Sequence, residues 1–286
     1  MKNVNNVQYQ TTLKDPLSFE GVGVHTAASA RVEIYPLRAG AGLQFRTDGV
    51  TFPATAEYVI DTQRATVIGA QGKTISTIEH LMAALFGMGV DNALICVDGP
   101  EIPILDGSAK IFADAIAAAG TRTLSEPRHR YVPTAPLFFR DGEKTLVVLP
   151  ASTLRIKFTV DYPAPVGALY FDGEITPEFF YREIAASRTF AFQHEVEALR
   201  RRGLALGGTL DNAIVFAPEG PLAPLRWPNE VVRHKVLDLI GDLALLGAQP
   251  QCEVISLKSG HKLNAVASKH LRRHVTADID RAASVT

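Results

Sequence analysis

The sequence predicts an α+β fold made of two similar domains, and three observations lead to this prediction. Strand-like and helix-like apolar patterns follow one another in a similar order in the two halves of the 286-residue chain. A polar stretch with alternating charges, residues 121–130 around Pro127, separates the two successions and is predicted to be a linker. The candidate catalytic residues come from both halves, so the active site is expected at the domain interface, where pockets are common. The predicted domains are residues 1–126 and 127–286, although no residue-level repeat relates them.

The first half is predicted to alternate strands with two helices. A β-rich run at residues 30–35 leads to an apolar-periodic helix at 77–88. A strand at 92–98 and a helix at 111–119 complete this unit near Gly120. The core face of the first helix is predicted from apolar residues spaced i, i+3, i+4 and i+7, namely Ile78, Leu81, Met82 and Leu85.

The second half is predicted to repeat this kind of succession. Strands are expected at residues 144–149, 154–160 and 253–257, and helices at residues 178–185 and 229–247. Asn229, which follows Pro228, is expected to be the N-cap of the longer helix. The core stripe of that helix is predicted to consist of Val232, Val236, Leu239, Ile240 and Leu243.

Composition excludes several classes of function. The net charge of −1, from 29 basic and 30 acidic residues, creates no long-range field, so nucleic acid is not expected as a partner. No run of about 18 apolar residues occurs, so stable membrane insertion is not expected. Residues 1–15 are polar and lack the apolar core of a signal peptide, which predicts a cytoplasmic protein. Cys96 and Cys252 lie in apolar strand-like runs and are expected to be free thiols, which excludes a disulfide framework.

Two helix-patterned segments, more than 150 residues apart, carry a possible metal site. His80 follows Glu79 in the first, and His234 precedes Asp238 by four residues in the second. On a helix, residues four apart differ by roughly 40° in direction, so His234 and Asp238 can converge on one ion. Two His and one carboxylate are the protein ligand count of a catalytic zinc site, in which the fourth position is left to water. The sequence therefore predicts a metal-dependent hydrolase.

Each half of this site has a simpler alternative explanation. His234 and Asp238 also fit an exposed i, i+4 pair on a solvated helix face. Ser76 and Glu79 also fit a capping box, in which Glu79 would only satisfy backbone N–H groups. His261 is placed in a loop after the strand at 253–257, where it is a candidate general acid.

Seven motifs in order connect the chain with a known family. They are GVGVHT (21–26), STIEH (76–80), PEIPILDGS (100–108), SRTF (187–190), RGLALGG (202–208), VRHKVLDLIGD (232–242) and KSGH (258–261). With these motifs, residues 17–265 resemble the UDP-3-O-acyl-N-acetylglucosamine deacetylases of lipid A biosynthesis. The resemblance implies two domains, each a β-sheet layered on helices, and hydrolysis of the N-acetyl amide of UDP-3-O-acyl-N-acetylglucosamine.

The resemblance also implies a role for each site residue. His80, His234 and Asp238 match the zinc ligands, and Fe²⁺ could use the same set. The residues that match catalytic positions are Glu79 as general base, His261 as general acid, Asp242 as its orienting partner, Thr189 at the oxyanion and Lys235 as an adjacent positive group. The residues that match substrate-binding positions are His25, Phe190, Leu204, Gly207 and Lys235.

Some expectations concern longer segments of the chain. The resemblance implies that residues 192–215 form an inserted unit that lines a passage for the acyl chain, and the alternative is that its apolar residues simply pack the unit's own core. Residues 61–73 match the family only loosely, so the preferred acyl length is left open. Residues 267–286 are expected to be partly disordered or to form a terminal helix without a catalytic role.

Three further expectations concern partners and function. The protein is expected to be a monomer. A noncatalytic binding protein on the same scaffold is a competing interpretation, but it would not need both Glu79 and His261. A zinc amidase for another N-acyl sugar would carry the same core motifs.

Overall fold

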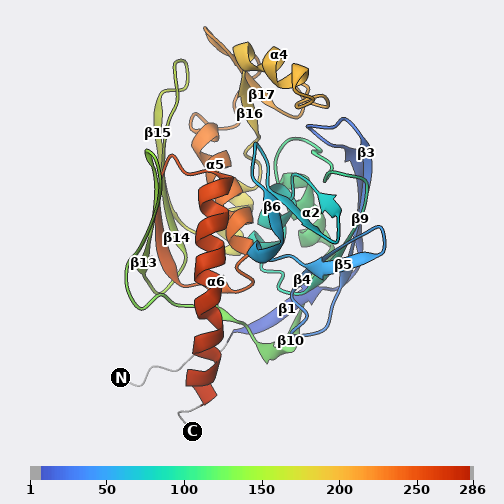
Figure 1. Cartoon of the computed structure of the whole chain (residues 1–286), viewed down its shortest axis with the longest axis vertical. Helices are drawn as coiled ribbons and strands as arrows, with labels where there is room; N and C mark the ends of the chain where they lie inside the picture. The colour runs from blue at the N-terminus through green and yellow to red at the C-terminus, as the bar shows by residue number, and fades with distance from the viewer. Residues whose placement is uncertain (1–7, 284–286) are drawn as a thin grey trace.

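Two large sheets and the helices between them form the framework of the protein. The computed structural model describes residues 8–283, and in these residues two five-stranded sheets lie on opposite outer sides of a double layer of helices (Figure 1). The first sheet has the order β2 (Leu17–Val22), β3 (Ser29–Pro36), β9 (Ala93–Asp98), β4 (Leu43–Thr47) and β5 (Val50–Pro53). The second has the order β12 (Leu137–Asp141), β13 (Lys144–Pro150), β20 (Cys252–Leu257), β14 (Arg155–Asp161) and β15 (Ala168–Glu174).

The two sheets share one topology. In each, the central strand pairs parallel with its neighbour on one side, β9 with β4 and β20 with β14, and the other pairings are antiparallel. Each central strand lies between two helices in the chain, α1 (Glu79–Gly87) and α2 (Lys110–Ala119) in the first half, α5 (Glu230–Ala244) and α6 (His261–Ala283) in the second. The predicted two-domain α+β fold is confirmed, and its duplication lies in the order and direction of the elements.

Strand alternation explains which face of each sheet meets the helices. In β3, Val32 and Ile34 are fully buried while their neighbours Arg31 and Glu33 face outward. In β14, Ile156 and Phe158 are buried in the same way. Because side chains alternate between faces, each sheet has one apolar face on the helices and one polar face toward solvent.

The predicted linker is partly a strand. Residues 121–127 form β10 (Thr121–Pro127), which pairs antiparallel with β1 (Tyr9–Leu13). The prediction was wrong because most β10 side chains are exposed, so the segment has no apolar alternation. All strands of the first large sheet precede β10 and all strands of the second follow it, and the division at residues 126 and 127 stays a prediction.

Each half carries a three-stranded insertion at the equivalent place, just before the helix that carries the candidate ligands. In the first half it contains β6 (Val59–Asp61), β7 (Val67–Ala70) and β8 (Lys73–Ile75). In the second it contains β16 (Phe190–Phe192), β17 (Ile214–Ala217) and β18 (Gly220–Pro221), with α4 (Gln193–Arg201) between the first two. This second insertion projects as a lobe at the top of Figure 1, and the predicted unit at 192–215 falls within it.

Other predicted helix ends differ in detail. The helix expected at 178–185 is a short turn, α3 (Pro177–Phe179), followed by a π-helical turn, η2 (Phe180–Ile184). Asn229 occupies the N-cap of α5, but its side chain accepts a hydrogen bond from Arg233 Nε at 2.7 Å and caps no backbone group. Residues expected to form a tail continue α6 as far as Ala283, and residues 284–286 lie outside the described part of the chain.

Helices α1 and α5 pack closely across the two halves. Gly241 makes this possible, because a Cβ atom at this position would lie 2.1 Å from the backbone oxygen of Glu79. The absence of a side chain lets the N-terminal turn of α1 approach the middle of α5. This contact brings the candidate residues of the two helices together.

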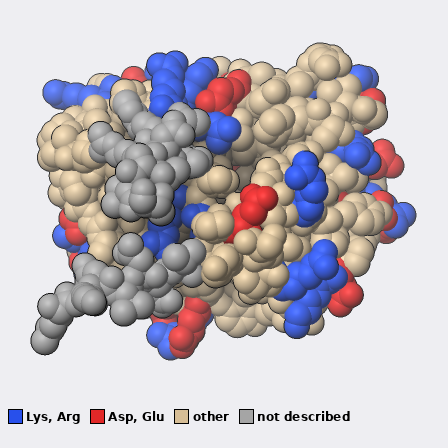
Figure 2. Space-filling model, turned by 90° about the horizontal axis from the view of Figure 1, so that it is seen from below, with Lys and Arg blue, Asp and Glu red and all other residues tan. Residues whose placement is uncertain are grey.

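Surface charge and hydropathy agree with the composition. On the described part of the face seen in Figure 2, cationic and anionic side chains are interspersed among uncharged residues. None of the described helices combines the length and the apolar character needed to cross a bilayer. Cys96 and Cys252 are both free thiols.

Candidate metal centre and active site

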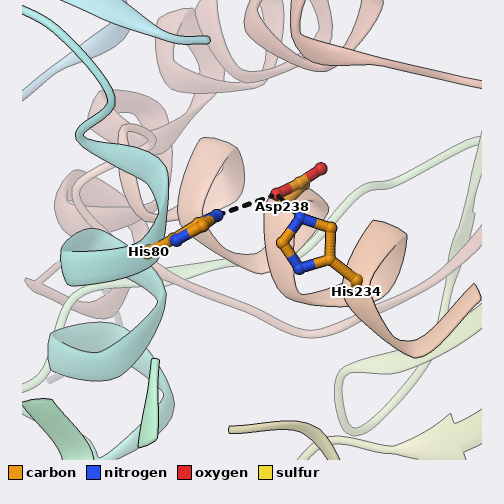
Figure 3. A group of neighbouring side chains, drawn as sticks. All are labelled: His80, His234 and Asp238. Atoms are coloured by element: carbon orange, nitrogen blue, oxygen red, sulfur yellow. Dashed lines mark ion pairs between the residues drawn. The ribbon is translucent and has the colours of Figure 1, made fainter. Parts of the chain in front are cut away.

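The structure brings His80, His234 and Asp238 together, although they come from two halves of the chain (Figure 3). His80 lies in the first turn of α1, and the other two lie one turn apart on α5. Asp238 Oδ1 is 3.7 Å from His80 Nε2 and 3.4 Å from His234 Nε2. One ligand atom from each residue lies within 4.8 Å of the others, and all three side chains are buried. The alternative of an exposed His–Asp pair is therefore wrong.

The protonation of the three residues fits a divalent metal ion. Burial lowers the pKa of His234, and burial together with the neighbouring His234 lowers the pKa of His80 to about 3, so both imidazoles are neutral at pH 7. Burial alone would raise the pKa of Asp238, but its electrostatic interactions, first with His234 and then with Lys235, lower it below its ordinary value. Two neutral imidazoles and an ionised carboxylate are the donor set that such an ion requires.

A backbone contact orients one of the imidazoles. His234 Nδ1 is 3.1 Å from the carbonyl oxygen of Ser187, which places the N–H at Nδ1 and leaves Nε2 free to bind metal. Ser187 is held next to α5 by a buried ion pair, in which Arg188 Nε lies 2.9 Å from Oε1 of Glu230, the first residue of α5. The SRTF motif therefore supports the ligand as well as lining the site.

Glu79 faces the metal centre and does not form a capping box. The N-cap of α1 is Ile78, and the N–H of Ser76 donates to the carbonyl oxygen of Pro100. The Glu79 carboxylate instead accepts a hydrogen bond from the backbone N–H of Thr66 at 3.0 Å. Burial raises the pKa of Glu79 to about 7, against the opposing charge of His261. A carboxylate with this pKa is suited to proton transfer near neutral pH.

His261 is the first residue of α6, so its prediction as a loop residue was wrong. The polar sequence before it, Ser259 and Gly260, resembles a loop but leads directly into the helix. His261 Nδ1 lies 3.0 Å from Asp242 Oδ2, and Nε2 lies 3.9 Å from both Glu79 Oε1 and Asp238 Oδ2. Burial alone would lower the pKa of His261, but Asp242 and Glu79 raise it to about 9.

Lys235 adds a positive charge beside the candidate metal ligands. Its Nζ atom lies 2.6 Å from Oδ2 of Asp238, on the side of the carboxylate away from the two imidazoles. Burial alone would lower the pKa of Lys235, but the charge of Asp238 outweighs burial and raises the pKa above its ordinary value. Lys235 is therefore a permanent cation at the site.

These residues open onto a cavity of about 720 Å³. Its wall includes the three candidate metal ligands together with Glu79 and His261, and it extends under the projecting lobe. On the lobe side the lining includes the apolar residues Val196, Leu199, Leu210 and Val215, together with the charged residues Glu195 and Arg200. Elsewhere the lining includes the cations Arg64, Lys144, Lys235, Lys258 and Lys262, and the last two are ion-paired with Asp161 and Asp141 of the same wall at 2.8 and 2.9 Å. The cavity can thus receive a molecule with one apolar and one anionic part.

Comparisons with known proteins identify the family. A family profile described as UDP-3-O-acyl N-acetylglycosamine deacetylase matches residues 10–273. The chain belongs to this deacetylase family. A deacetylase of that name from Syntrophotalea carbinolica is 44% identical over 264 residues, 90% of this chain and 85% of the relative. Its counterparts in Myxococcus xanthus and Phenylobacterium zucineum are each 44% identical, over 89% and 90% of this chain and 83% and 90% of the relatives.

Family membership confirms the resemblance drawn from the seven motifs. The deacetylase family consists of metalloenzymes, and the buried His80, His234 and Asp238 have the arrangement that a metal site needs.

Some of the expected substrate-binding residues line the cavity, and others do not. Of the expected substrate-binding residues, His25, Phe190 and Lys235 line the cavity, and so does Thr189, which was expected to be catalytic. Leu204 and Gly207 are absent from the described lining, which includes their neighbours Ala205 and Gly208 instead. Gly207 packs against the turn at Gly23, since a Cβ atom on Gly207 would lie 2.2 Å from the Gly23 carbonyl oxygen.

Two polar residues at the site were not predicted from the sequence. Thr66 donates its hydroxyl to Asp242 Oδ1 at 2.6 Å, and Asn264 donates its amide to Asp242 Oδ2 at 2.9 Å. Asn264 follows His261 by three residues, so the helical spacing would have indicated it if the start of α6 had been recognised. Thr66 lies 176 residues from Asp242, and no local pattern indicates that contact.

Proposed function

We propose that the protein hydrolyses the N-acetyl amide of UDP-3-O-acyl-N-acetylglucosamine, with Zn²⁺ as its cofactor. The products are acetate and UDP-3-O-acyl-glucosamine, and the reaction is the committed step of lipid A biosynthesis. The observation that carries the proposal is the buried ligand set of His80, His234 and Asp238 beside Glu79 and His261. The same ligands also suit Fe²⁺. The proposal includes a cytoplasmic location and a monomeric state.

His80, His234 and Asp238 would hold the ion at the cavity wall, which Glu79 and His261 also line. When bound, Zn²⁺ supplies Lewis acidity toward a water molecule and toward the amide carbonyl. Glu79 takes a proton from the attacking water, and its pKa of about 7 keeps a useful fraction ionised at neutral pH. The backbone N–H of Thr66 fixes one carboxylate oxygen of Glu79 and leaves the other toward His261.

His261 supplies the proton that the departing amine nitrogen needs. Its raised pKa of about 9 keeps the imidazole protonated at pH 7, so it enters the reaction as an acid. Asp242 holds Nδ1, which leaves Nε2 directed at the reacting atoms. The distance of 3.9 Å between His261 Nε2 and Glu79 Oε1 places acid and base around one small volume.

Thr189 and Lys235 stabilise the negative charge that develops on the carbonyl oxygen. Both lie on the cavity wall, and Lys235 is kept charged by Asp238. A hydroxyl donor and a fixed cation in a buried site stabilise such charge more strongly than water does, because they need not reorient.

The cavity also accounts for the two ends of the substrate. The apolar wall under the lobe, with Val196, Leu199 and Leu210, fits the acyl chain, while the cationic part of the wall fits the diphosphate. His25 and Phe190 complete the wall near the metal centre. Leu204 and Gly207 act indirectly in this proposal, by supporting the residues next to them.

The test is acetate release from UDP-3-O-acyl-N-acetylglucosamine by the purified protein. We expect release to stop after chelation and to return when about one equivalent of Zn²⁺ is added, with Fe²⁺ tested in parallel under anaerobic conditions. UDP-N-acetylglucosamine, which lacks the acyl chain, is the matched control and should react far more slowly. Absence of acetate from the folded, zinc-loaded protein would reject the proposed substrate, and other N-acyl sugars would then be tested.

A further inference from the structure

Thr66 is hydrogen-bonded to Glu79, the proposed base, and to Asp242, the residue that holds the proposed acid His261. It lies between β6 and β7, in the insertion of the first half, and is fully buried. Its backbone N–H donates to Glu79 Oε2 at 3.0 Å, and its hydroxyl donates to Asp242 Oδ1 at 2.6 Å. Thr66 is neither a candidate metal ligand nor part of the described cavity lining.

The hydroxyl fixes the rotation of the Asp242 carboxylate. Oδ2 of Asp242 accepts from His261 Nδ1 at 3.0 Å and from Asn264 Nδ2 at 2.9 Å. For Oδ1, the described residues provide one side-chain donor, the Thr66 hydroxyl. Asp242 is fully buried, so without this donor Oδ1 would be a buried anionic oxygen without a partner, which is costly. The carboxylate would turn toward other donors, and the His261 ring would lose its fixed orientation.

We propose that Thr66 is a positioning residue that fixes the position and orientation of the Glu79 and His261 side chains relative to one another. The proposal rests on the proposed function, because it takes these two residues to be the base and the acid. One residue on a short segment between strands sets two distances at once, since its N–H holds Glu79 and its hydroxyl holds the partner of His261. Catalysis depends strongly on the placement of the reacting groups, and a misplacement of about 1 Å can cost about 100-fold in rate.

The kinetic test compares Thr66→Val with Thr66→Ser. Valine has nearly the shape of threonine and keeps the backbone N–H, but it cannot donate to Asp242, whereas serine can. We expect Thr66→Val to lower kcat by about tenfold or more, with KM and zinc content unchanged, because a hydrogen bond to a buried charge is lost while the ligands and cavity wall remain. Thr66→Ser should restore most of the lost turnover. Thr74→Val, at an exposed position of β8 in the same insertion, is the control for a Thr to Val change.

A spectroscopic test does not depend on turnover. The Nδ1 proton of His261, held by Asp242 in a buried site, should give a resolved downfield signal in the proton NMR spectrum of the wild-type protein. We expect this signal to move or broaden in Thr66→Val and to stay in place in Thr66→Ser and Thr74→Val. An unchanged signal with unchanged kcat in Thr66→Val would overturn the role of Thr66 and leave the proposed function standing. If the wild-type protein releases no acetate, the proposed function fails, and the NMR comparison alone still decides whether Thr66 orients Asp242 and His261.

Discussion

Gly241→Ala should impair activity far more than it impairs folding. Gly241 faces the first turn of α1, and a Cβ atom there would lie 2.1 Å from the Glu79 backbone oxygen. Ordinary contact begins near 3.4 Å, so the two helices must separate locally by about 1.3 Å, the difference between these distances. The atom displaced belongs to the backbone, so a change of rotamer cannot relieve the contact.

The free energies involved can be compared. Overpacking of a close contact costs about 1–3 kcal/mol. Alanine in place of glycine inside a helix regains about 1 kcal/mol through helix propensity. The free energy of unfolding should therefore fall by about 2 kcal/mol or less. A misplacement of about 1 Å in a catalytic group costs about 100-fold in rate, and the displaced turn carries both Glu79 and His80.

The assay measures three quantities on one protein preparation: denaturant unfolding, zinc affinity against a competing chelator, and kcat/KM for acetate release. We expect near-normal unfolding, weaker zinc binding and kcat/KM lower by about 100-fold. Ala117→Gly, at an exposed position of α2, is the control for propensity and should lower stability by about 1 kcal/mol without affecting zinc or turnover. A Gly241→Ala protein that is more stable than wild type and equally active would refute the close approach of α1 and α5.

Three further predictions follow from individual site residues. His234→Ala should abolish stoichiometric zinc binding, whereas Glu79→Gln should keep the metal and lower turnover by about 100-fold or more. Metal analysis and acetate release measure these two effects. Full activity in either variant would contradict the role given to that residue. In the metal-free protein, NMR titration should find the pKa of His261 near 9, and Asp242→Asn should lower it toward 6.5, because the carboxylate charge is a main cause of the raised value. Since folding raises this pKa, the stabilisation that it represents is complete below about pH 6.5 and is lost as the pH rises through about 9. Glu230→Ala should lower the free energy of unfolding by about 3–5 kcal/mol, because it leaves the buried guanidinium of Arg188 without its carboxylate partner. Denaturant titration measures this loss, and a loss below about 1 kcal/mol would argue against the ion pair.

Local spacing explains why the centre of the site was predictable. His234 and Asp238 are one turn apart on one helix, and Glu79 and His80 are adjacent at the start of another. Helical geometry fixes the directions of such side chains relative to one another, so their arrangement can be predicted from the sequence. What sequence alone could not decide was whether the two helices meet, since exposed pairs and capping boxes have the same local patterns. The burial of all three candidate ligands decided this point.

Contacts between distant segments explain what the sequence did not reveal. Thr66 and Asp242 are joined across 176 residues, and neither segment has a pattern that depends on the other. The strand character of β10 comes from its pairing with β1, not from its own exposed side chains. The predicted cavity residue Gly207 is instead in contact with Gly23, a backbone approach that no periodicity indicates.

The candidate metal ligands come from both halves of the chain, and this origin has a consequence for metal binding. One half supplies His80 and the other supplies His234 and Asp238, so neither half holds the full ligand set while the other is unfolded or detached. Formation of the complete ligand set requires α1 and α5 to be in contact, so metal content reports whether the two halves have docked correctly. A substitution anywhere along the contact between α1 and α5 can produce a metal-deficient protein without touching a ligand. Metal content is therefore the first quantity to measure in any inactive variant, before a catalytic role is assigned to the changed residue.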